Sequence, residues 1–342
     1  MPAAPAHRLT VAVTGPTGDI GRSLLRSLER SREIERIVAM ARRPWDPLAA
    51  GLHKTEYRQG DVLDADSVQR LAAGADVLVH LAFLIMGSLP DTQRVNLEGS
   101  RNVFEAAVRS GCARVVYASS VAAYGFHDQN PPLLSEDTPP RGTKRHYYSE
   151  QKAELEGVLD DVLKGSGTSA YVFRPCIVAG PDALALVQSI PYVRLSERMP
   201  AAARRILELM PLMAPVLPDT GLSFQLVHHD DVATAFRAAV LGHGDPGVYN
   251  LAAPGTLTMA DLAAALGWYS VPVPDLALDA VAEMVARVPF VPVEAQWIES
   301  LRAPVLMDTS KARRELHWRP RHDAQQTLRS TIDCARSERL IR

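Results

Sequence analysis

The chain has 342 residues, of which 47% are hydrophobic and 22% are charged, a balance typical of a globular protein with a sizeable core. A formal net charge of −2 excludes the strongly basic surface with which many proteins bind nucleic acid. Only three cysteines are present, and no apolar run is long enough for a signal peptide or a membrane span, so we expect a cytoplasmic protein without a membrane span.

Short strands alternate with longer helices through the first 180 residues. The pattern predicts strands at residues 9–14, 36–41, 56–62, 76–82, 113–120 and 169–175. It predicts helices at residues 20–29, 66–73, 92–110 and 146–163. Alternating strands and helices indicate βαβ units with right-handed crossovers, so the predicted fold class is α/β, a doubly wound parallel sheet or Rossmann fold.

The pattern changes after residue 180. Further strands are predicted at 224–229 and 248–252, and helices at 201–210, 230–240, 259–267, 279–288 and 308–316, the last with Thr309 or Ser310 as its N-cap. We therefore predict an NAD(P)-binding domain over residues 8–180 that residues 223–252 complete. Residues 181–222 and 253–342 form a smaller, mostly helical substrate-binding region in this prediction.

A glycine-rich loop, "VTGPTGDIGRSLL", joins the first predicted strand to the first predicted helix. Gly15, Gly18 and Gly21 would allow a tight turn, close approach of a pyrophosphate and close helix packing. The spacing differs by one residue from the common dinucleotide fingerprint, and a glycine-rich turn without a ligand is the alternative. The same cofactor-binding loop includes Thr17, Asp19 and Ile20.

The residues after the second strand bear on the choice of cofactor. About 20 residues beyond the last glycine, NAD-binding proteins place a carboxylate on the ribose 2′-hydroxyl. Ala41, Arg42 and Arg43 stand there instead, and a guanidinium suits the 2′-phosphate of NADP. We therefore predict NADP as the preferred cofactor, with NAD as the alternative. In the alternative interpretation, the two arginines are solvated surface residues without a ligand. Asp61 is a candidate acceptor for the adenine amino group, or the start of a turn.

The stretch "HYYSEQKAELE" contains two tyrosines and a lysine. Residues four apart share one face of a helix, so Lys152 pairs with Tyr148, whereas Tyr147 faces the neutral Gln151. A phenol needs its pKa lowered by about 3 units to exchange a proton near neutral pH, and a nearby ammonium contributes to that shift. The fifth strand ends in Ser119 and Ser120, at the sheet edge where ligands bind in α/β proteins.

These residues resemble the extended short-chain dehydrogenase/reductase superfamily, in particular its NAD-dependent epimerase/dehydratase family. The resemblance rests on "TGPTGDIG", "GDVLD", "VHLAF", "VNLEGSRNVFEAA", "VVYASSVAAYG", "YSEQK", "VFRPCIVAGP", "LVHHDDVATAF" and "DTSKARRELHWRP", in family order.

The resemblance implies a role for each matching residue. Ser120 is the catalytic serine, Tyr148 the acid/base and Lys152 its partner, and all three lie near the nicotinamide together with Ser119. Asn96 has a structural or water-holding role, and His228 and Asp231 have structural roles. The other implied cofactor contacts are Asp61 and Val62 at the adenine, Leu81 and Ala82 along the ribose, and Pro175 and Ile177 at the nicotinamide.

The substrate stays open at this point. Residues 199–218 are largely apolar, as a lid over a lipophilic ketone or alcohol would be, but Arg194, Arg198, Arg204 and Arg205 could hold a diphosphate. Three functions follow: an NAD(P)-dependent oxidoreductase, a nucleotide-sugar epimerase or dehydratase, and a non-enzymatic NADP-binding sensor. The tyrosine–lysine pair counts against the sensor. The partner is in each case a small molecule, and a homodimer through the helices at 92–110 and 146–163 would be typical of the family.

Overall fold

The structure is a computed structural model, which describes residues 8–85, 87–144, 146–188, 190, 193, 215–273 and 305–341. The predicted helices at 201–210 and 279–288 lie outside the described residues, as does most of the apolar stretch 199–218. Arg194, Arg198, Arg204 and Arg205 also lie outside them.

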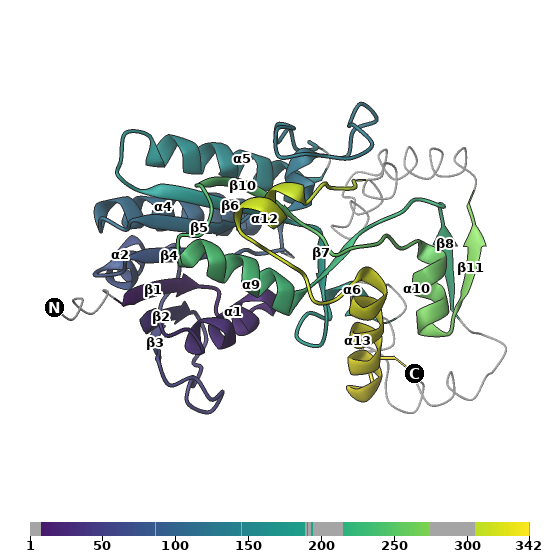
Figure 1. Cartoon of the computed structure of the whole chain (residues 1–342), viewed down its shortest axis with the longest axis horizontal. Coiled ribbons are helices and arrows are strands. Elements are labelled where there is room, and N and C mark those ends of the chain that lie inside the picture. The colour runs from purple at the N-terminus through teal and green to yellow at the C-terminus, as the bar shows by residue number, and fades with distance from the viewer. Residues whose placement is uncertain are drawn as a thin grey trace.

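A seven-stranded sheet forms the centre of the molecule (Figure 1). Its strand order is β10-β6-β5-β4-β1-β2-β3, and every neighbouring pair is parallel. The strands are β1 (Leu9–Thr14), β2 (Ile34–Ala41), β3 (Thr55–Gln59), β4 (Val77–His80), β5 (Arg114–Ala118), β6 (Ser169–Pro175) and β10 (Gly247–Leu251). The predicted doubly wound parallel sheet is confirmed.

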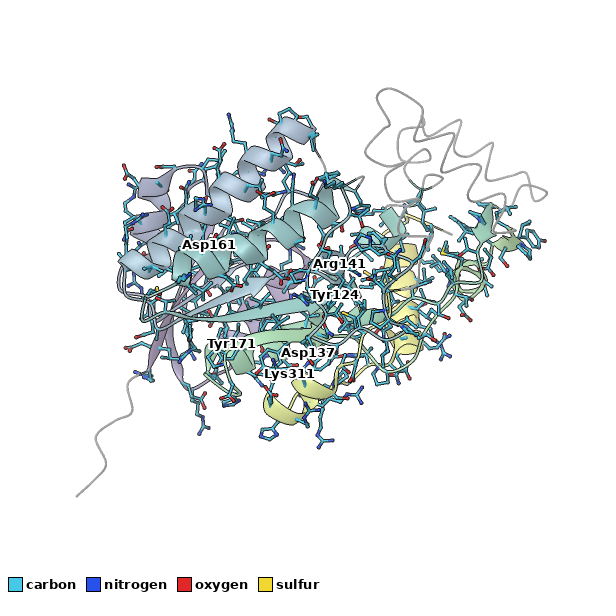
Figure 2. The ribbon with its side chains drawn as sticks, turned by 90° about the horizontal axis from the view of Figure 1, so that it is seen from above. Tyr124, Asp137, Arg141, Asp161, Tyr171 and Lys311 are labelled. Carbon is cyan, nitrogen blue, oxygen red and sulfur yellow. The ribbon has the colours of Figure 1, made fainter. Side chains whose placement is uncertain are left out.

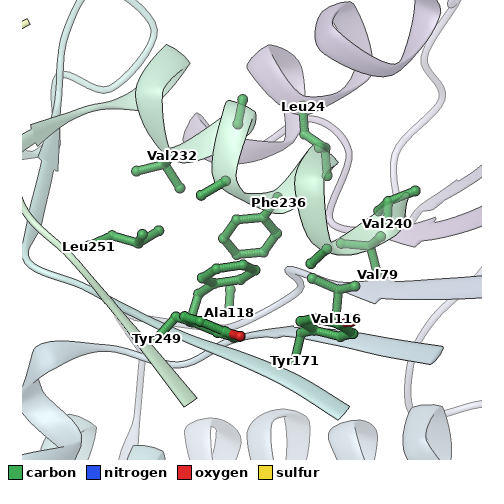
Figure 3. Close-up of a cluster of buried hydrophobic side chains, with 14 of the residues drawn as sticks. Leu24, Val79, Val116, Ala118, Tyr171, Val232, Phe236, Val240, Tyr249 and Leu251 are labelled. Carbon is green, nitrogen blue, oxygen red and sulfur yellow. The ribbon is translucent and has the colours of Figure 1, made fainter. Parts of the chain in front are cut away.

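Helices cover both faces of this sheet. On one face, α1 (Asp19–Glu29) packs against α9 (His229–Val240), and on the other α4 (Gly99–Arg109) packs between α2 (Ala65–Ala72) and α5 (Tyr147–Leu163). Strand side chains alternate between the faces, so β6 sends Phe173 toward α9 and Val172 toward α5. Figure 3 shows the α9 face, where the Phe236 ring lies 4.5 Å from that of Phe173.

Several element boundaries differ from the predictions. The strands β3, β4 and β5 end two to three residues early, so Asp61, Leu81 and Ser119 lie in loops just beyond them. The predicted helix 92–110 is divided into α3 (Leu89–Gln93), a π-helical turn (Arg94–Glu98) and α4. A π turn widens the helix locally and often occurs at functional sites. It holds Asn96 fully buried.

A smaller group of elements lies at one end of the molecule, to the right of the sheet in Figure 1. It includes two parallel strand pairs, β7 (Ile177–Ala179) with β9 (Leu226–His228) and β8 (Val216–Asp219) with β11 (Tyr269–Pro272). Of these four strands the sequence pattern predicted β9, within residues 224–229, and missed the other three. The helices α6 (Ala185–Gln188), α10 (Met259–Leu266) and α13 (Ala324–Ser337) share a separate apolar cluster there. The shared cluster gives this part a small core of its own.

The helix predicted at 308–316 is α12 (Ser310–Glu315), with Thr309 as its N-cap residue. The Thr309 side chain makes no capping hydrogen bond, and the Asp308 carboxylate accepts from the Ser310 N–H at 2.9 Å instead. After the helix, His317 adopts a left-handed conformation with φ 51°, which a glycine would adopt at lower cost.

Candidate active site

Most of the predicted cofactor residues lie at or just beyond the carboxyl ends of β1, β3, β4, β5 and β6. Because all these strands are parallel, their carboxyl ends share one edge of the sheet. That edge therefore brings together the glycine loop, Asp61 with Val62, Leu81 with Ala82, Ser119 with Ser120, and Pro175 with Ile177.

Two of the three loop glycines are required by close packing within the protein, whether or not a ligand binds. Gly15 has φ +69°, and a Cβ there would lie 2.7 Å from the Ala82 nitrogen; a Cβ on Gly21 would lie 2.3 Å from the Gly15 oxygen. Gly18 differs, because it has ordinary extended backbone at the N-cap of α1 and a Cβ would meet only the Gly15 oxygen at 3.5 Å. The free N–H groups at this helix N-terminus fit an approaching pyrophosphate.

The adenine and ribose candidates are held by local hydrogen bonds. The Asp61 carboxylate accepts from the Leu63 N–H at 3.0 Å, and Asn102 donates to the Val62 carbonyl at 3.0 Å. The Thr14 hydroxyl accepts from the N–H groups of Leu81 and Ala82, both at 3.3 Å. These contacts hold the backbones of the loops after β3 and β4 in place.

Arg42 and Arg43 are exposed directly after β2, next to the loop that follows β1. Their carbonyls accept hydrogen bonds from Gln59 at 3.1 Å and from Tyr57 at 3.0 Å, so β3 holds the backbone of this turn. Arg22, on the first turn of α1, donates to the Thr17 carbonyl at 3.2 Å and adds a third guanidinium near the glycine loop.

The predicted catalytic residues are brought together. Tyr148, in the first turn of α5, makes a side-chain hydrogen bond with Ser120. Ser120 is the N-cap of the short helical turn Val121–Tyr124, and its oxygen accepts from the Ala122 N–H at 3.2 Å. Lys152 lies one turn along α5 from Tyr148 and donates to the Ala118 carbonyl at 2.7 Å. The i, i+4 argument therefore selected the tyrosine that contacts the serine.

Burial controls the ionisation of this group. It raises the pKa of Tyr148, and the hydrogen bond with Ser120 lowers it in part. Burial also lowers the pKa of Lys152 to about 7, and the charge of Glu156 opposes that effect. Burial therefore brings the pKa of the amine close to physiological pH but moves the pKa of the phenol away from it, and the hydrogen bond with Ser120 acts against the second effect.

Tyr147 has a different partner. Its hydroxyl donates to the Ile85 carbonyl, in the loop that follows β4. That loop forms an apolar wall beside Tyr148, because the Phe83 ring meets the Tyr148 ring edge-on at 5.4 Å. Ile85 itself is 43% exposed.

Asn96 holds this apolar wall in place. Its side chain accepts from the Leu84 N–H at 2.7 Å, donates to the Leu84 carbonyl at 3.0 Å and donates to Gln151 at 2.8 Å. The π-helical turn thus links the wall to α5, which fits the structural role implied for Asn96.

Two charged residues near the catalytic group were not singled out from the sequence. Ser119 donates to the carboxylate of Glu156, which also accepts from the Arg174 Nε at 3.0 Å. Glu156 is four residues after Lys152, so the spacing that selected Tyr148 could have found it. Nothing in the sequence alone paired Arg174 with it.

His228 and Asp231 have structural contacts. His228 caps α9 by accepting from the Asp230 N–H at 3.2 Å. Asp231 accepts from the N–H groups of Arg321 and His322, at 2.9 and 3.1 Å, and so ties the C-terminal segment to α9.

Sequence comparison identifies the family. Residues 11–252 match the NAD dependent epimerase/dehydratase family. The chain belongs to this family. It is therefore an enzyme of the short-chain dehydrogenase/reductase superfamily. Among the described residues, no helix combines the length and the apolar character that a membrane span requires.

Two relatives are similar to part of the chain. Human 3 beta-hydroxysteroid dehydrogenase type 7 is 34% identical over 175 residues, which are 48% of this chain and 46% of that protein. The ceramide reductase of Caulobacter vibrioides is 31% identical over 240 residues, 69% of this chain and 63% of that one. The matches thus span less than two thirds of the length of either relative.

Solved structures extend the resemblance of the fold to almost the whole chain. UDP-glucuronic acid 4-epimerase from Bacillus cereus, solved in complex with NAD, aligns with a TM-score of 0.70. The alignment covers 96% of this chain and 99% of that one, at 18% identity.

Proposed function

We propose that this chain is an NAD(P)-dependent oxidoreductase that interconverts a carbonyl and a secondary alcohol on a lipophilic substrate. The observation that carries the proposal is the arrangement of Tyr148, Ser120 and Lys152 at the carboxyl edge of the sheet, with the phenol bonded to the serine. A glycine loop at the N-terminus of α1 supports dinucleotide binding at the same edge.

The bound nicotinamide would give a hydride to the carbonyl carbon during reduction, or take one from the carbinol carbon during oxidation. In reduction, Tyr148 gives its hydroxyl proton to the substrate oxygen, and Ser120 holds that oxygen by a hydrogen bond. The Lys152 ammonium stabilises the phenolate that remains until solvent returns the proton. Oxidation uses the same groups in the opposite direction.

A lipophilic substrate is favoured by the surface next to Tyr148. Phe83, Leu84 and Ile85 present apolar side chains there, and burying apolar surface contributes about 25 cal/mol per Å² to binding. The names of the two relatives also refer to lipids, a hydroxysteroid and a ceramide. The nucleotide-sugar enzymes resemble this chain at low identity, which speaks to the fold alone.

The test compares Tyr148→Phe with Tyr147→Phe, which makes the same change on the neighbouring residue. With NADPH and a panel of steroid and long-chain ketones, we expect Tyr148→Phe to lower kcat by about 10³-fold and to leave NADPH binding, followed by fluorescence, unchanged. We expect Tyr147→Phe to lose less than about tenfold, because its hydroxyl donates to the Ile85 backbone carbonyl and the substitution leaves Ser120 and Lys152 in place. Equal activity of Tyr148→Phe and wild type contradicts the proposal. Conversion of UDP-sugars without added cofactor would favour an epimerase.

We further propose that Arg42 contacts the 2′-phosphate and so makes NADP the preferred cofactor. Arg42→Ala is expected to raise the Kd for NADPH about tenfold, the value of one charge-assisted hydrogen bond, and to change the Kd for NADH less than about twofold. Arg30→Ala, an exposed arginine just beyond the other end of α1, is the control. Equal losses for both cofactors would show that Arg42 does not recognise the phosphate.

A further inference from the structure

A buried ion pair lies directly behind the catalytic residues. Glu156 is 5% exposed and Arg174 is 1% exposed, and the guanidinium donates from Nε and Nη2 to both carboxylate oxygens. Removing two charges from water costs more than their attraction usually returns, and well-packed apolar residues often replace such a pair without loss of stability. Stability alone is therefore a poor reason for this arrangement.

The contacts of the pair lead to the catalytic group. Tyr148, Lys152 and Glu156 follow one another at four-residue spacing on the face of α5 that meets the end of β5. Consecutive residues of β5 and its following loop hold this face, since Ala118 accepts from Lys152 and Ser119 donates to Glu156. Ser120, which bonds Tyr148, comes next.

Arg174 anchors the carboxylate from β6. Its guanidinium lies 4.3 Å from the centre of the Tyr124 ring and also donates to the Thr138 carbonyl at 3.3 Å. Tyr124 in turn donates to Asn250 of β10 at 2.7 Å, and Figure 2 shows it in the middle of the molecule. The position of Glu156 is therefore fixed through β6, β10, the helical turn that holds Tyr124 and the loop that holds Thr138.

The charges around Lys152 make Glu156 distinctive. The groups that face the ammonium are Phe83 after β4, His80 on β4, Tyr117 on β5, and Tyr148 and Glu156 on α5, with Arg174 of β6 behind Glu156. His80 and the two tyrosines are neutral at pH 7, since burial lowers the pKa of His80 to about 3 and raises the pKa of each phenol. Among these groups Glu156 alone carries a negative charge; Asp160, one turn further along α5, is exposed.

We propose that Glu156 is a positioning residue of the catalytic centre, which holds the Ser119 hydroxyl and supplies the negative charge that keeps Lys152 protonated in its buried site. Arg174 fixes that carboxylate in place. The catalytic consequence rests on the proposed oxidoreductase function, whereas the effect on Lys152 does not. The burial that lowers the pKa of Lys152 to about 7, against the opposing charge of Glu156, supports the proposal.

The first experiment follows the Lys152 ammonium directly, without substrate or cofactor. The chain has five lysines, so [13Cε]lysine NMR gives a small set of resonances, and Lys152→Met assigns the relevant one. We expect the Lys152 titration midpoint to fall by about one pH unit in Glu156→Gln, the smaller end of the effect of an adjacent opposite charge. Glu156→Asp keeps the charge and should keep the midpoint near that of wild type.

A matched control removes a carboxylate elsewhere. Glu105→Gln makes the same chemical change in the exposed Glu105–Arg109 pair of α4, and should leave the Lys152 midpoint unchanged. If Glu156→Gln fails to fold, the double variant Glu156→Gln/Arg174→Met avoids an uncompensated guanidinium and should also lower the midpoint. An unchanged midpoint in the folded variants overturns the proposal, whatever reaction the enzyme catalyses.

The second experiment uses the ketone substrate identified with wild type. A purely structural residue would lower kcat at every pH, whereas loss of the Glu156 charge should also move the alkaline limb of the reduction profile to lower pH. Removing this negative charge makes both Lys152 and Tyr148 lose their protons more easily, so the two groups shift the limb in the same direction. We expect a fall in kcat of about tenfold or more, with the Kd for NADPH changed less than twofold. An unmoved limb contradicts the electrostatic role.

Discussion

The two faces of the central sheet are built from the same strands and both bury apolar clusters, but at the carboxyl ends of the strands one face also buries polar and charged groups. On the apolar face, toward α1 and α9, the strands present Val79, Val116, Ala118, Tyr171 and Phe173, which pack against leucine, valine and phenylalanine side chains of the helices (Figure 3). On the polar face, toward α4 and α5, the carboxyl ends of the strands and the loop after β5 present His80, Tyr117, Ser119 and Arg174, against Tyr148, Lys152 and Glu156 of α5.

Because of this difference, side chains that stabilise the fold and side chains of the proposed active site lie on opposite faces of the same strands. Burial of apolar side chains stabilises the apolar face. On the polar face, burying charges costs free energy, so we attribute these charges to the function of the sheet edge and not to stability. Strand alternation makes the separation possible, because neighbouring residues of one strand point to opposite faces. Substitutions on the two faces should therefore have opposite signatures.

The largest effect is expected from Lys152→Met on the polar face. Loss of the ammonium should lower kcat by about 10³-fold. The same change should raise the free energy of unfolding by about 1 kcal/mol at pH 7, because the unfolded chain binds this proton more tightly than the folded one, in which burial lowers the pKa of Lys152 to about 7. Steady-state kinetics and urea unfolding measure the two quantities. Loss of stability in this variant would contradict the separation of the two faces.

Phe236→Ala, on the apolar face, should show the reverse. Phe236 is fully buried against Phe173, and removing a buried phenylalanine costs about 3–5 kcal/mol. The fraction that stays folded should keep the wild-type KM and kcat. Leu48→Ala, at a leucine that is 65% exposed, is the control and should cost almost nothing. A large change in KM for Phe236→Ala would show that this face also shapes the active site.

The sequence was informative where a local rule applied. Strand–helix alternation was enough for the fold class, and i, i+4 spacing on a single helix selected Tyr148 over Tyr147. What it missed depends on contacts between distant segments: the ion pair joins residues 18 positions apart, and β7 pairs with β9 across about 50 positions. The π turn at Asn96 could not be predicted from neighbouring residues either, because the Asn96 side chain bonds to Leu84 and Gln151, which are distant in the sequence.

The smallest effect is expected in the pH dependence of stability, which should be a property of the polar face. His80 is fully buried between Thr14 and Ser100, and burial, helped by the Lys152 charge, lowers its pKa to about 3. An unfolded histidine binds a proton near pH 6.5, so the stabilising contribution is complete above that pH and is lost as the pH falls toward 3.

Between pH 6.5 and pH 5.5 the protein should therefore lose about 1 kcal/mol through His80, and His80→Gln should remove that part of the slope. Urea unfolding at several pH values measures it, with His53→Gln, at an exposed histidine, as the control. His146 and His228, whose pKa values burial lowers to about 4, contribute in the same direction, so the His80→Gln slope should decrease without vanishing. If the slope of stability against pH in His80→Gln equals that of wild type, His80 takes up its proton without disturbing the fold. The polar face would then tolerate a buried charge more readily than its burial implies.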